Sequence, residues 1–241
     1  YELAKVVYLL DKREDANLQT LYSIEVLLYR LLEHHGNIND TKFIKEIMSN
    51  PESLMEIIDK TYLSSDENER SAEIEQVKND NSYALLGWHI FYTLRQTPFV
   101  DSNSTIDEVA LNNYIDQLQT LGNAKHKIKD INTVIGELLG NYPETEDYPP
   151  VPICDIIERL NNKEVNDGFR TRLYNKRGIT VRPAYDGGTL EKNEANKYKK
   201  YADKIRYTHP IVCSIFDDLS SYYNRMAKTE DTKAKIEKME F

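Results

Sequence analysis

The segment RLLEHH places Arg30 five residues before His35. A histidine can exchange a proton near neutral pH, and an arginine can stabilise negative charge that develops on a reacting group. The two residue types therefore have the capacity for acid–base chemistry on an anionic substrate. They also suit an ordinary helix end, because histidines in the last turn oppose the negative end of the helix dipole.

The spacing of Arg30 and His35 resembles the R-x4-6-H motif of HEPN-type ribonucleases. The resemblance implies an RNA-cleaving enzyme in which His35 is the general acid or base and Arg30 stabilises the phosphorane at a dimer interface. Motifs of that family commonly carry a polar residue directly after the arginine, whereas this chain has Leu31. A HEPN-like ribonuclease is therefore one alternative function.

The other chemistry-bearing residues form no catalytic or metal-binding pattern. The sequence has no phosphate-binding loop, dinucleotide fingerprint, H-E-x-x-H or G-x-S-x-G motif. Cys154 and Cys213 lie in apolar helical contexts, so we expect buried, inert side chains. Adjacent histidines such as His34 and His35 diverge on a helix and make a poor metal pair. The sequence predicts no cofactor and no metal site.

Charge is distributed unevenly along the chain, whose formal net charge is -9. Residues 1–162 hold 14 basic and 28 acidic side chains, whereas residues 163–210 hold 12 basic and 6 acidic ones. We predict that the basic segment carries a partner-binding surface. Its predicted residues are Arg177, Arg182, Lys192, Lys199 and Lys200. The alternatives are that these charges pair internally or with a longer parent chain, or that residues 163–210 bind a nucleic-acid backbone.

Apolar residues recur at helical spacing almost throughout, and no convincing strand pattern occurs. We predict an all-α fold, either an irregular helical bundle or a short α-solenoid of antiparallel helix pairs. Asn50 and Pro51 should cap and open one helix, and YALLGWHIFYTLRQ, apolar all round, should lie at the centre of the core. The four prolines of NYPETEDYPPVP divide an acidic helical half, 1–142, from a basic helical half, 151–241, which we expect to pack as one module of a larger protein.

Residues 178–188 interrupt the helical pattern of the basic half. Gly178 suits a helix end, and Pro183 and the Gly187-Gly188 pair disfavour helix. This predicts an extended strap whose apolar residues pack back onto the helices, with Arg177 and Arg182 presented to a partner. The expected apolar contacts are Ile179, Val181 and Tyr185.

The segment RLYNKRGITVRPAYDGGTLEKNEANKYKKYADKIRYTHPIVCSIFDDLSSYYNRMAKTED resembles the C-terminal helical region of very large, largely uncharacterised bacterial proteins. Those proteins carry a similar NxRGV turn, an acidic-Gly-Gly step, a YxxxA helix and a closing helix that ends near ED. LYSIEVLLYRLLEHHG is similar to an upstream segment of the same proteins. The resemblance implies a helical-repeat-like module of a larger intracellular bacterial protein and assigns it no activity.

We therefore expect a non-catalytic scaffold or partner-recognition module, whose partner is a protein or the remainder of a parent chain. The sequence has no apolar run of bilayer-spanning length, so no membrane association is expected. Two cysteines are too few for a disulfide framework, which favours a cytoplasmic location. The HEPN-like ribonuclease and the nucleic-acid-binding reading of residues 163–210 stay open.

Overall fold

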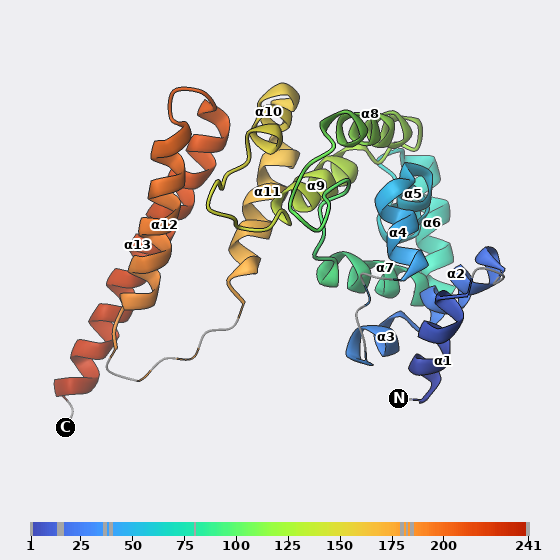
Figure 1. Cartoon of the computed structure of the whole chain (residues 1–241), viewed down its shortest axis with the longest axis horizontal. Coiled ribbons are helices and arrows are strands. Elements are labelled where there is room, and N and C mark those ends of the chain that lie inside the picture. Colours follow the sequence, from blue (N-terminus) through green and yellow to red (C-terminus); the bar gives the residue numbers. More distant parts are fainter. Residues whose placement is uncertain are drawn as a thin grey trace. The chain divides into compact units, whose positions relative to one another are not determined.

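The structure is a computed structural model of the chain (Figure 1). It describes residues 2–13, 17–35, 38, 41–79, 81–178, 181, 183 and 186–239. These residues form thirteen α-helices and no β-strand, with a single isolated bridge between Val100 and Ile106. The predicted all-α class is therefore confirmed. Within the same residues, we find no helix with the length and apolar character that a bilayer crossing requires.

The first of two compact units spans Tyr1–Ile131. Its helices, in chain order, are α1 (Glu2–Asp11), α2 (Leu18–Leu27), α3 (Tyr29–His35), α4 (Lys42–Ser49), α5 (Pro51–Thr61), α6 (Glu67–Asn79), α7 (Ser82–Thr93) and α8 (Glu108–Ala124). Helix α9 (Ile128–Gly140) begins in this unit and ends in the second one. Helices such as α4, α5 and α8 bury an apolar stripe, whereas α6 has no buried residue among those described.

The helix starts of the first unit follow local capping chemistry. The Asn50 side chain accepts a hydrogen bond from the Glu52 N–H, and Pro51 occupies the first turn of α5, as predicted. Thr41 caps α4 by accepting from the Ile44 N–H. Asp107 does the same for α8. At the start of α4 the Phe43 N–H also donates to Glu25 Oε2 of α2 at 2.7 Å, so a tertiary contact supplements the local cap.

A fully buried lysine joins three parts of the first unit. The Lys127 amine lies 2.8 Å from Asp59 Oδ1 and 2.9 Å from Glu73 Oε1, and it also donates to the Asp59 carbonyl oxygen. Burial raises the pKa of the Asp59 carboxyl, but the hydrogen bonds and charges of Lys127 and Lys125 outweigh it, so the net pKa is lowered. The cluster clamps α5 and α6 to the start of α9.

The second unit spans Asn132–Phe241. It contains the rest of α9, then α10 (Val151–Leu160), α11 (Lys163–Lys176), α12 (Thr189–Ile205) and α13 (Pro210–Met239). Figure 1 shows α12 and α13 lying side by side as a long helical hairpin. Helices α10 and α11 both pack against α13. The proline-rich segment 143–150 lies within this unit.

Two glycines allow α9 and α11 to cross with their backbones nearly in contact. A Cβ on Gly136 would lie 2.1 Å from the Val165 carbonyl oxygen, and one on Gly168 would lie 2.1 Å from the Thr133 carbonyl oxygen. Both distances are far below any real Cβ contact, so only glycine fits at either position. This crossing sets the position of α11 in the second unit.

Stacked tyrosines fill the interior of the α12–α13 hairpin. The Tyr198 ring stacks on Tyr223 at 5.8 Å and on Phe216 at 6.1 Å between ring centroids. Tyr198 and Tyr223 are buried, and the Tyr198 hydroxyl donates to the Leu173 carbonyl oxygen. Burial raises the pKa of Tyr223 to about 12. Tyr198 and Tyr223 therefore belong to the core, whereas Tyr174 and Tyr207 are exposed.

Two expectations about apolar residues are wrong. Helix α7 was expected at the centre of the core, yet Leu85, Trp88 and Tyr92 are 55%, 61% and 64% exposed. These three residues share one face of α7 that no described neighbour covers, while Ile90 on the other side is buried. Val181 of the strap is 93% exposed, so it does not pack on the helices.

Part of the predicted 178–188 strap cannot be compared with the structure, because Ile179, Arg182 and Tyr185 lie outside the described residues. Gly178 has φ of +64°, as expected of a glycine that ends a helix. At the far end, the Gly188 N–H donates to Asp231 Oδ1 at 2.9 Å. A Cβ on Gly188 would lie 2.3 Å from the Ala227 carbonyl oxygen, so this glycine lets the strap end touch the α13 backbone.

Candidate functional site

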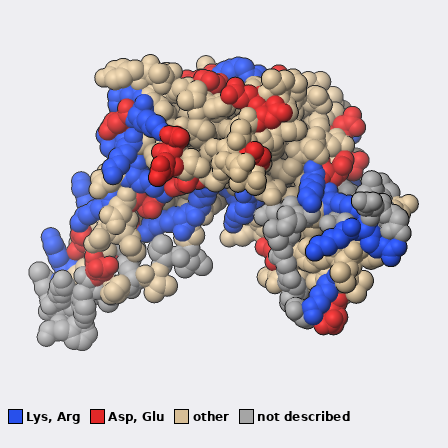
Figure 2. Space-filling model, viewed as in Figure 1, with Lys and Arg blue, Asp and Glu red and all other residues tan. Residues whose placement is uncertain are grey.

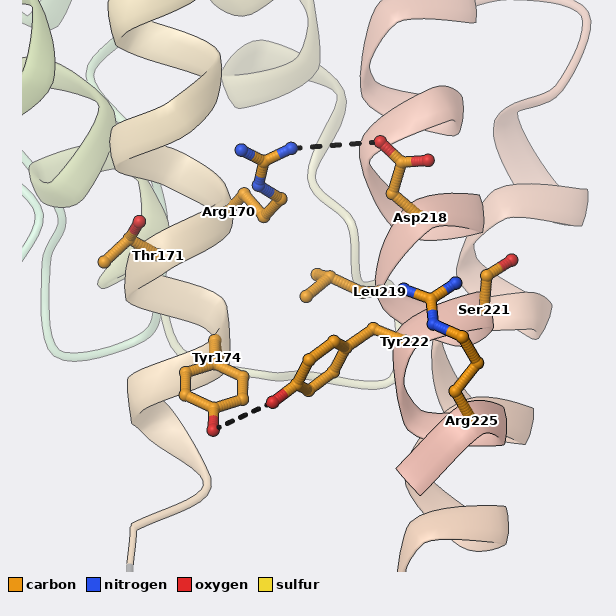
Figure 3. Close-up of a pocket in the computed structure, with 8 residues that line it drawn as sticks. All are labelled: Arg170, Thr171, Tyr174, Asp218, Leu219, Ser221, Tyr222 and Arg225. Atoms are coloured by element: carbon orange, nitrogen blue, oxygen red, sulfur yellow. Dashed lines mark hydrogen bonds and ion pairs between the residues drawn. The ribbon is translucent and has the colours of Figure 1, made fainter. Parts of the chain in front are cut away.

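A pocket between α11 and α13 is a candidate binding site of the second unit. Its volume is about 530 Å³. Figure 3 shows Arg170 directed toward Asp218, and Tyr174 toward Tyr222, across the space between the two helices. The lining residues are Arg170, Thr171, Tyr174, Asp218, Leu219, Ser221, Tyr222 and Arg225. We call this site the arginine–tyrosine pocket.

Helical periodicity brings these side chains together. Arg170 and Tyr174 are four residues apart on α11, so they lie one above the other on the same face. Asp218, Tyr222 and Arg225 follow one another on α13 at spacings of four and three residues, which also place them on one face. Because α11 packs against α13, the two stripes face each other across the pocket.

The two arginines of the pocket differ in how they are held. Arg170 lies 2.6 Å from Asp167 Oδ1 on its own helix and 3.9 Å from Asp218 Oδ2 across the pocket. Arg225 is exposed, and no carboxylate pairs with it in the part of the chain that the structure describes. The Arg225 guanidinium therefore keeps its five donors and its charge available for a bound anion.

Two tyrosines form the aromatic wall of the pocket. The Tyr222 hydroxyl donates to the Tyr174 hydroxyl at 3.3 Å, and the rings meet edge to face with centroids 5.4 Å apart. The hydrogen bond to Tyr174 and partial burial raise the pKa of Tyr222. Behind them, buried Tyr223 stacks on Tyr174 at 6.1 Å, and Leu219 is buried at the base. The wall is thus rigid and amphipathic, which suits contact with another ring.

This arrangement suits binding better than catalysis. Guanidinium groups recognise carboxylates and phosphates, hydroxyls such as those of Thr171 and Ser221 add directional hydrogen bonds, and tyrosine rings add apolar area. The lining residues of the pocket include no cysteine, histidine or lysine, and Asp218 is the one carboxylate among them. The geometry supports recognition of an anionic group next to an apolar or aromatic one.

The predicted basic surface lies elsewhere, and its charges are largely paired. Arg177 binds Glu191 Oε1 at 2.7 Å, and its guanidinium lies 5.4 Å from the centre of the Tyr223 ring. The Arg177 side chain is only 12% exposed and that of Glu191 is fully buried. This arginine therefore helps to hold α12 to α11 and α13, and it is not presented to solvent.

The predicted lysines differ in their surroundings. Lys192 binds Asp231 at 2.7 Å, and Lys199 lies 3.1 Å from Asp217 and 3.3 Å from Asp203. Lys200 is exposed, and Arg182 lies outside the described residues. On the face drawn in Figure 2, blue and red side chains both occur over the α12–α13 region. Some of these acidic partners, Asp217 and Asp231, lie outside residues 163–210 and were therefore not included in the charge count of the basic segment.

The Arg30–His35 pair lies on the short helix α3. Arg30 is exposed, whereas the side chain of His35 is not among those described. The intervening Glu33 lies 2.7 Å from the His89 ring on α7, and buried Tyr29 shares a hydrogen bond with Thr93. These two contacts, Glu33 with His89 and Tyr29 with Thr93, connect α3 to α7.

The two cysteines are buried, as predicted. Burial raises the pKa of the Cys154 thiol to about 12 and also raises that of Cys213. Neither thiol is therefore a thiolate near neutral pH, and neither is an activated nucleophile.

Comparisons with family models, with curated proteins and with solved structures gave no match to this chain. Functional inference therefore depends on the geometry of the chain itself. Sequence reasoning missed the arginine–tyrosine pocket because its residues come from two helices 48 positions apart, as the Tyr174–Tyr222 contact shows. The available signal was the arginine–tyrosine spacing on each helix, Arg170 with Tyr174 and Tyr222 with Arg225.

Proposed function

We propose that this chain is a non-catalytic helical module that recognises an acidic segment of a protein partner through the arginine–tyrosine pocket. The observation that carries the proposal is an exposed arginine, Arg225, beside an aromatic wall in a pocket of about 530 Å³. That volume lies within the range of pockets that enclose a side chain or a small ligand. Arginine and tyrosine are also the residue types that dominate the energetics of protein interfaces.

The charge of the molecule favours a protein partner over nucleic acid. The chain carries a net charge of -9, and several cations of its basic segment, among them Arg177, Lys192 and Lys199, are paired with carboxylates of the same unit. Nucleic-acid binding depends on several unpaired cations that release counterions from a phosphate backbone. A pocket with one unpaired guanidinium suits a short acidic peptide better.

The resemblance to the C-terminal region of large bacterial proteins supports a place for this module within a longer intracellular chain. Two buried, unpaired thiols are compatible with a reducing cytoplasm. In this proposal, the module connects the parent chain to an acidic partner.

Binding of a fluorescein-labelled 12-residue peptide rich in glutamate, with one central tyrosine, tests the proposal by fluorescence anisotropy. We expect Arg225→Ala to weaken binding about tenfold and to flatten its salt dependence, since one charge-assisted contact is lost. Lys200→Ala, which removes an exposed cation outside the pocket, is the matched control and should leave the affinity unchanged. A charge-inverted peptide with lysine in place of glutamate should not bind.

Labelled single-stranded RNA in the same assay separates the alternatives. Absence of peptide binding together with an RNA shift that Lys200→Ala weakens would replace the proposal with backbone binding by the basic segment. RNA cleavage that disappears in His35→Ala would replace it with the HEPN-like reading. Equal effects of Arg225→Ala and Lys200→Ala on the peptide would show that the pocket is not the contact.

A further inference from the structure

A second cavity of the second unit holds a half-buried lysine amine. The cavity has a volume of about 560 Å³ and lies beside the ends of α11 and α12. It shares no residue with the arginine–tyrosine pocket, and the inference below does not depend on the proposed function. Its lining residues are Pro143, Glu144, Lys176, Arg177, Leu190, Asn193, Glu194 and Lys197.

The Lys176 amine is held in a fixed position within this cavity. It donates a hydrogen bond to the Tyr142 carbonyl oxygen, and its nitrogen lies 5.9 Å from the centre of the buried Tyr148 ring. In its neutral form the amine can keep this hydrogen bond as a donor while its lone pair stays available. The position therefore suits a nucleophile that does not depend on another side chain for orientation.

Several neighbours influence the charge of Lys176. Burial lowers the pKa of its amine to about 8, Glu144 opposes this effect, and the nearby cations Arg172 and Lys197 add to it. Lys197 is itself paired, with Glu194 at 2.8 Å and Glu144 at 3.4 Å. A usable fraction of Lys176 is thus neutral near pH 7, which an ordinary solvated lysine is not.

The charges around the cavity select the class of ligand. Its lining cations are Lys176, Arg177 and Lys197, and Arg172 is a further cation near Lys176. The carboxylates that balance these four charges are Glu144 and Glu194 of the lining, Glu191, which binds Arg177, and Glu137, which interacts with Arg172. The set is neutral when Lys176 carries its proton, so it has no excess charge for an anion. We propose that the Lys176 amine forms a reversible imine with a small, uncharged aldehyde bound in this cavity.

The reaction conserves the charge balance of the site. The Nζ lone pair of Lys176 attacks the carbonyl carbon, and the carbonyl oxygen takes up a proton to give a carbinolamine. Loss of that oxygen as water leaves a protonated imine, so ammonium and aldehyde become iminium and water with no oxidant or reductant. The positive charge stays beside Glu144 and over the Tyr148 ring. Acylation would instead remove this charge and leave the carboxylates unbalanced.

Reductive trapping with propionaldehyde and cyanoborohydride at pH 7 tests this assignment on the whole chain. The alkylated lysines are quantified by mass spectrometry after digestion with a protease that cuts at glutamate, at low total labelling. With a pKa of about 8 in place of 10.5, the neutral fraction at pH 7 is larger by about 300-fold. An amine of lower pKa is a weaker nucleophile, and half-burial limits access to Lys176, so its reaction rate rises by less than its neutral fraction. We therefore expect Lys176 to react at least tenfold faster than exposed Lys200.

Two further measurements test the proposal, the pH dependence of the labelling rate at Lys176 and labelling with a charged aldehyde. The rate at Lys176 should level off above about pH 8, and the preference should fall when glyoxylate, an anionic aldehyde, replaces propionaldehyde. Lys176→Arg should remove the fast site and leave labelling at Lys200 unchanged. Equal rates at Lys176 and Lys200 at pH 7 would overturn the proposal of an imine-forming amine. A preference for glyoxylate would overturn the uncharged ligand class.

Discussion

Gly136→Ala tests the close helix crossing that positions α11 and, with it, one side of the arginine–tyrosine pocket. The added Cβ would lie 2.1 Å from the Val165 carbonyl oxygen and 2.7 Å from the Phe169 nitrogen. Both obstacles are backbone atoms of a hydrogen-bonded helix, so no side-chain rotation relieves the contact. Helix α11 must move away from α9 as a body, or its hydrogen bonds must break.

The expected cost follows from the size of the overlap. Ordinary contact begins at 3.4 Å, so the shortfall at the Val165 oxygen is about 1.3 Å. A shift of that size separates well-packed neighbours, including the fully buried Val165 and Phe169 side chains. Overpacking of a core costs about 1–3 kcal/mol, and we place this backbone clash at or above the top of that range. Alanine recovers about 1 kcal/mol of helix propensity, so the net loss of unfolding free energy should be about 2–3 kcal/mol.

Hydrogen-exchange mass spectrometry is the suitable assay, because it resolves the two units within one chain. Gly136→Ala should speed exchange in peptides of residues 132–241 and leave the slowest peptides of the first unit unchanged. Asn175→Ala places the same residue at an exposed position of α11 and should shift exchange by no more than about 0.5 kcal/mol.

A double substitution gives the decisive comparison. Gly168 contacts the other side of the same crossing, so Gly168→Ala should cost about as much as Gly136→Ala. Once the Cβ of one alanine has separated the helices, the second alanine causes a smaller additional loss of unfolding free energy. The double variant should therefore lose less than the sum of the two single variants, by 1 kcal/mol or more. Strict additivity, or stabilisation by Gly136→Ala from helix propensity alone, would refute the close crossing.

Three further predictions concern buried ionisable groups. Lys127→Met should lower the unfolding free energy of the first unit by about 2–3 kcal/mol in urea titrations followed by Trp88 fluorescence, because carboxylates of the clamp lose their partner. The wild type should also lose stability as the pH falls below about 4, where Asp59 with its lowered pKa becomes protonated, and Lys127→Met should lose less. Burial lowers the pKa of the Lys176 amine to about 8, so between pH 8 and 10 this amine binds fewer protons in the folded chain than in the unfolded chain. The free energy of unfolding should therefore rise over this pH range in the wild type but not in Lys176→Met. Cys154 should resist a maleimide in the folded chain and react on unfolding, and rapid labelling of the native protein would contradict its burial.

Local periodicity was enough to predict the all-α class. In α9, for example, Ile131, Ile135 and Leu138 recur at helical spacing, and all three side chains are buried. Asn50 and Pro51 marked a helix start because capping is a property of a few adjacent residues. Helical spacing and capping depend on residues that are close in sequence, so both can be predicted without knowing what packs against the helix.

Burial of a whole helix could not be predicted in the same way. The apolar residues of α7 suggested contacts on every side, yet Leu85, Trp88 and Tyr92 are exposed. One face of the helix lies so close to α5 that a Cβ on Gly87 would lie 1.8 Å from the Thr61 hydroxyl oxygen. How many faces find a neighbour depends on the packing of other elements, which the composition of a single helix does not determine.

The same reasoning explains why charge counting pointed away from the arginine–tyrosine pocket. A count over residues 163–210 ends just before α13, and that helix supplies Asp217 to Lys199 and Asp231 to Lys192. The segment is therefore basic in sequence but balanced in space. Arg225 lies beyond the counted segment, on α13 itself, where no described carboxylate offsets it. Whether a charge is paired depends on which residues lie near it in the folded chain. For this reason Arg225, the unpaired arginine of the arginine–tyrosine pocket, lies outside the segment 163–210 that is most basic in sequence.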